Sequence, residues 1–268
     1  YVHIKKGTKN MRNVFITTIA AVAFAGAANA ADLGGSVGVE FTENSAGDYI
    51  ATTTLGMGVS SGGLAFGSFD IESVDGATFA LDGWQLGTTV GTTTVSIGDQ
   101  GDLFPGAGLE IVGDDTLADP ATNDSVMADF GNVAFMVGFT DVTTDVSDIA
   151  NTQASVSTAA AGADVTLAVD YNNVSHDLTY GADVGYTYNA ALLGLVATYA
   201  DSNKTTAYEA SAGYGIVTAF VNGDNSDWSQ NVGAGVNTEF GGLNVYAEGA
   251  YNLDAKDTTL GAGLSFNF

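Results

Sequence analysis

Residues 178–188 read LTYGADVGYTY, and this stretch decides the fold. Every second residue, from Leu178 to Tyr188, is apolar or aromatic, and the residues between them are Thr, Gly and Asp. A period of two is the spacing at which side chains of a β-strand point to opposite faces. The stretch therefore predicts a strand with one apolar face and one face of small or polar residues.

The same alternation recurs along the chain after residue 32. Counting it predicts sixteen strands, at 33–43, 49–60, 63–71, 79–90, 92–99, 125–131, 132–140, 151–159, 163–171, 178–188, 191–200, 206–213, 215–222, 229–239, 242–251 and 257–268. Two of these runs lose phase, near Ser68 and near Gly83, which indicates either β-bulges or errors in the count. The sequence thus predicts an all-β protein of about sixteen strands.

The connections between these strands are alternately short and long. The short set consists of Ser61-Gly62, Gly91, Gly131-Asn132, Ala161-Gly162, Asn189-Ala190, Tyr214-Gly215 and Gly241. The long, mostly acidic set consists of residues 44–48, 72–78, 100–124, 141–150, 172–177, 201–205, 223–228 and 252–256. Short turns at one end and longer loops at the other are typical of an antiparallel β-barrel in a bacterial outer membrane, with the short turns in the periplasm.

The aromatic residues give a second indication of a membrane barrel. At predicted outward positions they fall near the loop ends of strands (Phe41, Tyr49, Phe79, Phe139, Tyr171, Tyr199, Tyr208, Tyr251) and near the turn ends (Phe130, Tyr186, Tyr188, Tyr214, Phe240, Phe266, Phe268). The outward residues between these two groups are mostly Ala, Val and Leu. Two aromatic girdles around an aliphatic band indicate a lipid-facing surface.

The charge balance excludes several classes of function. The chain has 6 Lys and Arg against 31 Asp and Glu, and four of the bases precede residue 13. From residue 31 onward the count is therefore 2 − 31, or −29. Such a charge repels nucleic acid, so no nucleic-acid partner is expected. The absence of cysteine excludes disulfides and thiolate metal sites.

The first thirty residues have the pattern of an export signal. Arg12 precedes an apolar run from Val14 to about Ala28, and Ala28-Asn29-Ala30 is a small-residue cleavage pattern. We therefore expect a signal peptide at 11–30 and a barrel at 31–268. Residues 1–10, upstream of Met11, are interpreted as an over-extended leader. The apolar run is shorter than the about 20 residues that a transmembrane helix needs.

On these features the chain from 31 to 268 resembles the sixteen-stranded general porins of Gram-negative bacteria, and the α-proteobacterial ones in particular. The resemblance is carried by the leader, the strand rhythm, the terminal Phe268, and Ser96-Ile97-Gly98-Asp99 followed by the long segment 100–124. It implies a homotrimer among membrane lipid and lipopolysaccharide, assembly through the C-terminal Phe268, and a third loop folded into the lumen. It also implies ion transport and passive diffusion of small hydrophilic solutes.

The candidate functional residues are acidic. The resemblance places a pore constriction on the third loop, whose acids include Asp102, Glu110, Asp114, Asp115 and Asp119. Strand parity points a second set into the lumen: Glu40, Asp129, Asp164, Asp170, Asp183, Glu209, Glu239 and Glu248. Related porins face their loop acids with arginines, but this chain has no arginine after residue 31. A uniformly negative lumen would favour cations, although solvated surface charge explains the same acids.

Other chemistry has weaker support in the sequence. Asp114, Asp115 and Asp119 offer oxygen ligands for a loosely bound Ca²⁺, without the spacing of an EF-hand. No cofactor and no enzymatic activity are expected, because His176 is the sole histidine after the leader and carboxylate pairs are too abundant to indicate a catalytic dyad. Two alternatives stay open: a structural or adhesive outer-membrane barrel without solute flux, and a secreted soluble β-protein.

Overall fold

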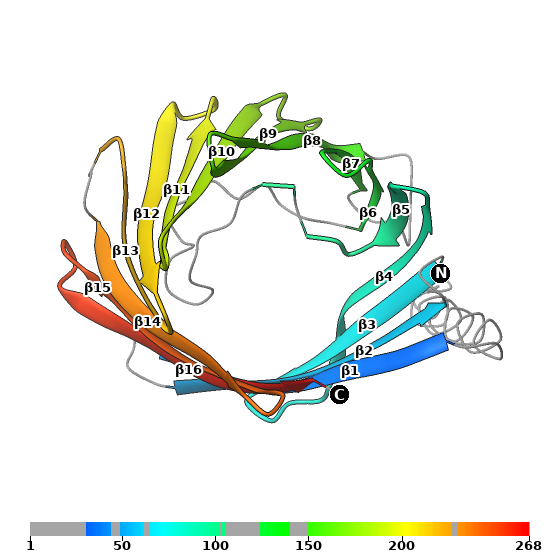
Figure 1. The fold of residues 1–268 in the computed structure, drawn as a ribbon, viewed down its shortest axis with the longest axis horizontal. Coiled ribbons are helices and arrows are strands. Elements are labelled where there is room, and N and C mark those ends of the chain that lie inside the picture. Colours follow the sequence, from blue (N-terminus) through cyan, green and yellow to red (C-terminus); the bar gives the residue numbers. More distant parts are fainter. Residues whose placement is uncertain are drawn as a thin grey trace, which may run out of the picture.

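The computed structural model describes residues 31–43, 49–61, 65–101, 103–104, 124–139, 149–226 and 230–267. These residues form one closed antiparallel barrel, in which each strand pairs with its neighbours in the sequence and the last strand pairs with the first. Figure 1 shows the strands following one another round the ring in chain order. The all-β barrel predicted from the alternation is therefore confirmed.

The described residues contain sixteen strands. They are β1 (Ala31–Glu43), β2 (Tyr49–Ser61), β3 (Ala65–Val74), β4 (Ala80–Val90), β5 (Thr93–Gly98), β6 (Ser125–Asp129), β7 (Val133–Phe139), β8 (Ile149–Ala160), β9 (Ala163–Asn172), β10 (Leu178–Tyr188), β11 (Ala191–Ala200), β12 (Thr205–Tyr214), β13 (Val217–Asp224), β14 (Asn231–Phe240), β15 (Leu243–Asn252) and β16 (Asp257–Asn267). The largest difference from the predicted ends is at β3, predicted to end at 71 and found to end at Val74.

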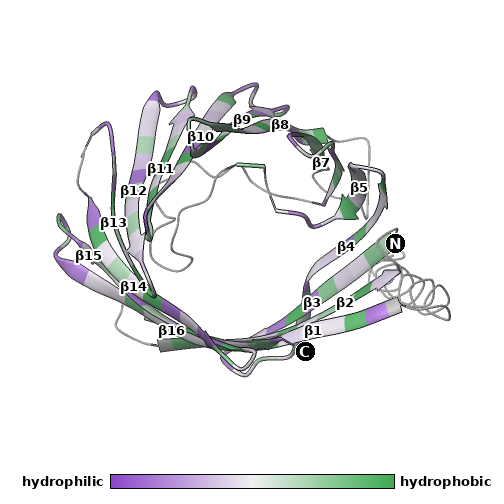
Figure 2. Cartoon of the chain, in the orientation of Figure 1, coloured by the Kyte–Doolittle hydropathy of each residue, from purple (hydrophilic) through white to green (hydrophobic). Residues whose placement is uncertain are grey.

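The two faces of the barrel wall differ in chemistry. Along one face, directly paired residues form apolar rows such as Val37–Leu55–Ile71, and the apolar residues of this face are exposed: Leu167 by 51%, Leu195 by 47% and Leu264 by 46%. The other face carries most of the buried polar residues, among them Gln153, Glu209 and Asn222. Because only the concave face of a closed barrel is covered by the wall around it, the buried polar face is the inner one. Hydrophobic and hydrophilic residues alternate accordingly along the strands in Figure 2.

The outward aromatic residues lie near both ends of the strands. Tyr180 stacks on Tyr199 with ring centroids 6.3 Å apart, near the loop end. Phe130 meets Phe135 edge to face at 6.4 Å, near the turn end. Phe240, also at the turn end, is 83% exposed. The side chain of Tyr49 and residue Phe268, both predicted in these girdles, lie outside the described residues.

The alternation in the sequence is interrupted near Ser68 and near Gly83, and of these two places the strand pairing has a bulge only near Gly83. Between β3 and β4, Asp70 pairs with Gly83 and Ile71 pairs with Leu81, so Asp82 is the extra residue. Near Ser68 the pairing is regular. The phase is lost there because Phe66 points inward, where its ring occupies the space that a Cβ on Gly87 would take.

The short connections within the described residues are tight turns that use left-handed backbone conformations. Ala161 and Gly162 have φ of 53° and 84°, and Gly241 and Gly242 have φ of 61° and 83°. Positive φ at both central residues is the pattern of a type I′ hairpin, whose twist matches that of the flanking strands. These turns set the register of the hairpins, and the register decides which side chains face inward.

Candidate functional site: the inner wall of the barrel

The eight acids that strand parity predicted to point into the lumen lie on the inner face of the barrel wall. They are Glu40 on β1, Asp129 on β6, Asp164 and Asp170 on β9, Asp183 on β10, Glu209 on β12, Glu239 on β14 and Glu248 on β15. Their positions follow from the register: Asp183, for example, pairs with Val196, which in turn pairs with Glu209. Glu209 (1% exposed) and Asp170 (4%) are buried near the loop end, whereas Asp164 and Glu239 are exposed near the turn end.

Glu40 is held by two hydroxyl groups. Tyr246 on β15 donates to its Oε2 at 2.8 Å, and Thr42 donates to its Oε1 at 3.0 Å. Tyr246 reaches Glu40 by crossing β16 at Gly263, which pairs directly with both residues. A side chain on Gly263 would prevent this crossing, because its Cβ would lie 2.5 Å from the Tyr246 ring.

Four further acids join Glu40 in what we call the β1–β5 acidic cluster: Asp70, Glu72, Asp82 and Asp99. Asp70 is repelled electrostatically by Asp82 and Asp99, and Glu72 by Asp82 and Glu40. The carboxylates of Asp70 and Asp99 both come within 4 Å of the position that a Cβ on Gly83 would take. Sequence reasoning missed Asp70 because inward Phe66 breaks the alternation of β3, Glu72 because β3 was predicted to end at 71, and Asp82 because it is the extra residue of the bulge. Phe69 and Ile71, both outward, would have marked Asp70 and Glu72 as inward.

A second polar group lies on β8 and β9. Asn151 Nδ2 donates to Asp170 Oδ1 at 2.9 Å, and Gln153, which is 1% exposed, pairs directly with Asp170. On the other side of the barrel, three paired asparagines form a ladder across β13, β14 and β15. In this ladder Asn231 donates to Asn222 and Asn252 donates to Asn231, each at 2.9 Å. The inner wall is thus acidic or amide-rich on several strands.

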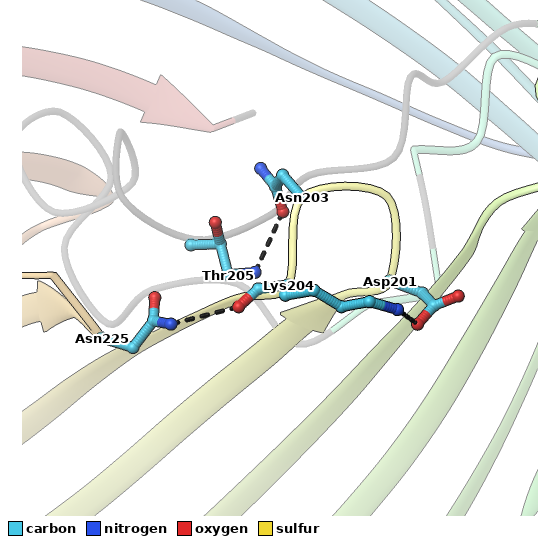
Figure 3. Close-up of polar contacts among 5 residues, drawn as sticks. All are labelled: Asp201, Asn203, Lys204, Thr205 and Asn225. Atoms are coloured by element: carbon cyan, nitrogen blue, oxygen red, sulfur yellow. Dashed lines mark hydrogen bonds and ion pairs between the residues drawn. The ribbon is translucent and has the colours of Figure 1, made fainter.

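The two bases after residue 31 lie in connections between strands. Lys204, in the β11–β12 connection, forms an ion pair with Asp201, as Figure 3 shows. Asn225, from the β13–β14 connection, donates to the Lys204 carbonyl, and Asn203 accepts from Thr205 N–H. The hydrogen bond to the Asp201 carboxylate raises the pKa of Lys204. Lys256, in the β15–β16 connection, has φ of 58° and donates its N–H to the Asn252 carbonyl.

Several predicted positions lie outside the described residues. They are the constriction residues Asp102, Glu110, Asp114, Asp115 and Asp119, which include the three possible Ca²⁺ ligands, the signal peptide at 11–30, and Phe268. Within the described ranges, no group of three or more His, Cys, Asp or Glu residues is arranged to hold a metal ion. Those ranges also contain no helix with the length and apolar character needed to cross a membrane.

The comparison with solved structures identifies the fold of this chain. No family model and no curated protein matches the sequence. Among solved structures, two mutants of the porin of Rhodopseudomonas blastica superpose with TM-scores of 0.63 and 0.64, each at 16% sequence identity. A triple mutant of the same porin superposes with a TM-score of 0.59 at 17% identity. Each alignment covers 89% of this chain and 100% of the porin chain. The chain therefore has the porin fold, as a closed barrel whose described residues form sixteen strands.

Proposed function

We propose that this protein is an outer-membrane porin that passes small hydrophilic solutes by passive diffusion and prefers cations. The observation that carries the proposal is the closed sixteen-stranded wall whose inner face holds acids on many strands, while both bases after residue 31 lie in connections. A barrel of this strand number is wide enough to leave an aqueous channel. Fixed negative charge along such a channel concentrates cations and excludes anions.

The outer face supports a location in the outer membrane of a Gram-negative bacterium. Its residues are apolar and exposed, as at Leu193, Leu195 and Leu264, each exposed by more than 40%. In water such a surface is unfavourable by about 25 cal/mol per Å², whereas in hydrocarbon it is favourable. The aromatic residues near both strand ends fit the two interfaces of a bilayer, in contact with lipid and lipopolysaccharide.

The porin proposal carries four subsidiary proposals. Residues 100–124 narrow the channel and set its size limit, the chain forms a homotrimer, Phe268 serves as an assembly signal, and Ca²⁺ binds loosely at the loop acids. No cofactor takes part, because diffusion is downhill and needs no energy source. The fold suits a channel better than an enzyme, since its inner residues line a wall rather than a closed cleft.

Conductance in planar bilayers tests the channel directly. Protein refolded from residues 31–268 should give discrete conductance steps, and under a KCl gradient the reversal potential should have the sign of potassium permeation. The absence of steps would favour a non-conducting structural or adhesive barrel. Steps that select chloride would refute the cation preference. Recovery of the native protein in the secreted soluble fraction, without detergent, would refute the membrane barrel.

Charge removal tests whether the inward acids cause the selectivity. The double variant Asp129→Asn/Asp183→Asn should lower the cation-to-anion permeability ratio by roughly two- to fivefold. Two unit charges 4 Å apart in water interact by about 1 kcal/mol, which corresponds to a concentration ratio of roughly five. The control Asp177→Asn/Asp254→Asn removes two charges from loops and should change the ratio much less. Equal effects of the two variants would mean that net charge, and not the inner wall, sets the selectivity.

A further inference from the structure

The chain leaves β5 along the inner face of the barrel and is held there by side-chain amides. We call residues 99–101, 103 and 104 the exit segment. Gln100 Nε2 donates to the Ser125 carbonyl on β6 at 3.1 Å, and its Oε1 accepts from Gln85 on β4 at 3.3 Å and from Ser96 on β5. Further along, Leu103 N–H donates to Gln153 Oε1 on β8 at 2.7 Å. The segment thus starts at β5 and is fastened three strands away.

The length of the segment leaves little slack between the two glutamines. Strands β5 and β8 are three places apart, and at about 4.8 Å per strand they lie about 14 Å apart. Three residues, the separation of Gln100 and Leu103 along the chain, can span at most about 10 Å. The reach of the two glutamine side chains makes up the remainder. The loss of either glutamine therefore removes one of the two attachments that hold this short segment to the wall.

The wall beneath the crossing is apolar, unlike most of the inner face. Ser96 pairs with Met127, Met127 pairs with Met136, and Met136 pairs with Gln153, so two methionines lie between two polar ends. Met136 is 2% exposed and Gln153 is 1% exposed. Inward methionines are favourable in a wet lumen when they are covered, and Met136, directly paired with Gln153, is buried.

We propose that Gln100 and Gln153 form a clamp that fixes the exit segment across β6 and β7 and so determines from which point of the inner wall the β5–β6 connection continues. Both are positioning residues, because they act through the backbone that they hold. Gln100 fastens the start of the segment to β4, β5 and β6. Gln153 fastens its far end to β8 by accepting from Leu103 N–H, and the same side chain also lies against Asp170. The consequence for solute flow rests on the proposed porin function, but the clamp itself does not.

Thiol accessibility at residue 103 tests the clamp without relying on conductance. The chain has no cysteine, so Leu103→Cys introduces a single reporter and keeps the backbone N–H. In this background, Gln153→Met keeps the length of the side chain and removes the amide acceptor. A hydrogen bond contributes about 1 kcal/mol, so the labelling rate with a maleimide should rise roughly fivefold in refolded protein. Gln100→Met, on the other arm, should also raise it.

Two matched variants separate the clamp from general loosening of the barrel. Ser155→Ala changes the next inward position on β8 and should leave the labelling rate unchanged. Asp170→Asn changes the other polar neighbour of Gln153 and leaves the Gln153 acceptor oxygen for Leu103, so it should stay close to the parent rate. The heat-dependent mobility of the barrel in gels verifies that each variant is folded. Equal labelling of Gln153→Met, Gln100→Met and Ser155→Ala would overturn the clamp.

Conductance of the same variants distinguishes failure of the clamp from failure of the proposed function. If the protein is a porin, single channels of Gln153→Met should fluctuate between levels, whereas those of Ser155→Ala should be as steady as the parent channels. Steady Gln153→Met channels in a conducting parent would overturn the role of the clamp in solute flow. A parent that does not conduct would refute the porin, while the labelling result would still decide the clamp.

Discussion

Three inward aromatic residues each lie over a glycine on the neighbouring strand. Phe66 pairs with Gly87, Phe220 with Gly233 and Tyr246 with Gly263. In every pair, a Cβ on the glycine would lie within about 2.5 Å of the ring. The alternation in the sequence could not predict these pairs, because it assigns aromatic residues to the outer face, and each glycine becomes a partner only once the register is known.

At this scale we expect Gly263→Ala to destabilise the barrel by about 2 kcal/mol, because overpacking a filled space costs about 1–3 kcal/mol. The added Cβ would displace Tyr246 from Glu40. In a Tyr246→Ala background the same change should cost little, since the ring is gone. Urea unfolding in detergent micelles, followed by tryptophan fluorescence, measures this double-mutant cycle. A similar cost in both backgrounds would contradict the explanation.

Gly185 supplies the matched control for this cycle. It is also an inner strand glycine, on β10 and paired with Asp164, but nothing lies within 4 Å of the position that its Cβ would take. Gly185→Ala should therefore be neutral or stabilise the barrel by about 0.5 kcal/mol, because glycine in a strand is less favourable than alanine.

Among the elements, the strands and their connections were the most predictable part of the fold. Most strands repeat the same period of two, and most of the described short connections carry Gly or Asn where the backbone has a positive φ, as at Gly91, Asn189 and Gly215. Less was predictable where one residue is inserted. The bulge hid the place of Asp82 itself, and Ala150, skipped between the Gly138–Asn151 and Phe139–Ile149 pairs, went unnoticed.

The β8–β9 turn offers a stabilising change. Ala161 has φ of 53° although it has a Cβ, and a left-handed conformation costs such a residue about 1 kcal/mol. Asn-Gly is the preferred sequence for a type I′ turn, so Ala161→Asn should raise the free energy of unfolding by about 1 kcal/mol. Ala160→Asn, at the adjacent strand position, should bring no gain. Urea titration of both variants decides the matter, and an equal change in the two would contradict the turn argument.

Two of the longer connections are built alike. In residues 172–176 and 252–256 the first Asn accepts from the N–H groups two and three residues later, and its carbonyl accepts from the fifth residue. That fifth residue, His176 or Lys256, has positive φ. These connections are thus closed by their own asparagine, which explains how loops rich in polar residues keep a defined shape at the loop end.

At the scale of the whole molecule, the acidic residues of the inner wall are separated from the two lysines. Acids occupy inner positions from β1 to β15, while Lys204 and Lys256 lie in connections. This separation could be predicted from the sequence, because strand alternation assigns the acids to the inner face and the two lysines fall between predicted strands. The sequence could not reveal the exit segment on the inner wall, because the contact between Leu103 and Gln153 joins residues 50 positions apart.

This separation predicts a selectivity that depends on salt. The screening length falls from about 10 Å at 0.1 M to about 3 Å at 1 M ionic strength. If fixed inner charges act across an aqueous lumen, the cation-to-anion permeability ratio should fall markedly between these two concentrations, as measured from reversal potentials at a constant KCl gradient. A ratio that does not change with salt would point to a narrow binding site and against a diffuse field.

The order of the strands also has a consequence for how the barrel forms. All ladders but one join strands that are adjacent in the sequence, most of them through a short or moderate connection. The exception is the β1–β16 ladder, which joins the two ends of the barrel through seven residue pairs, against thirteen between β1 and β2. A chain that assembles hairpin by hairpin forms this ladder last, and until then β1 and β16 are open edges. The Tyr246–Glu40 hydrogen bond crosses this seam, so it is available only once the ring has closed.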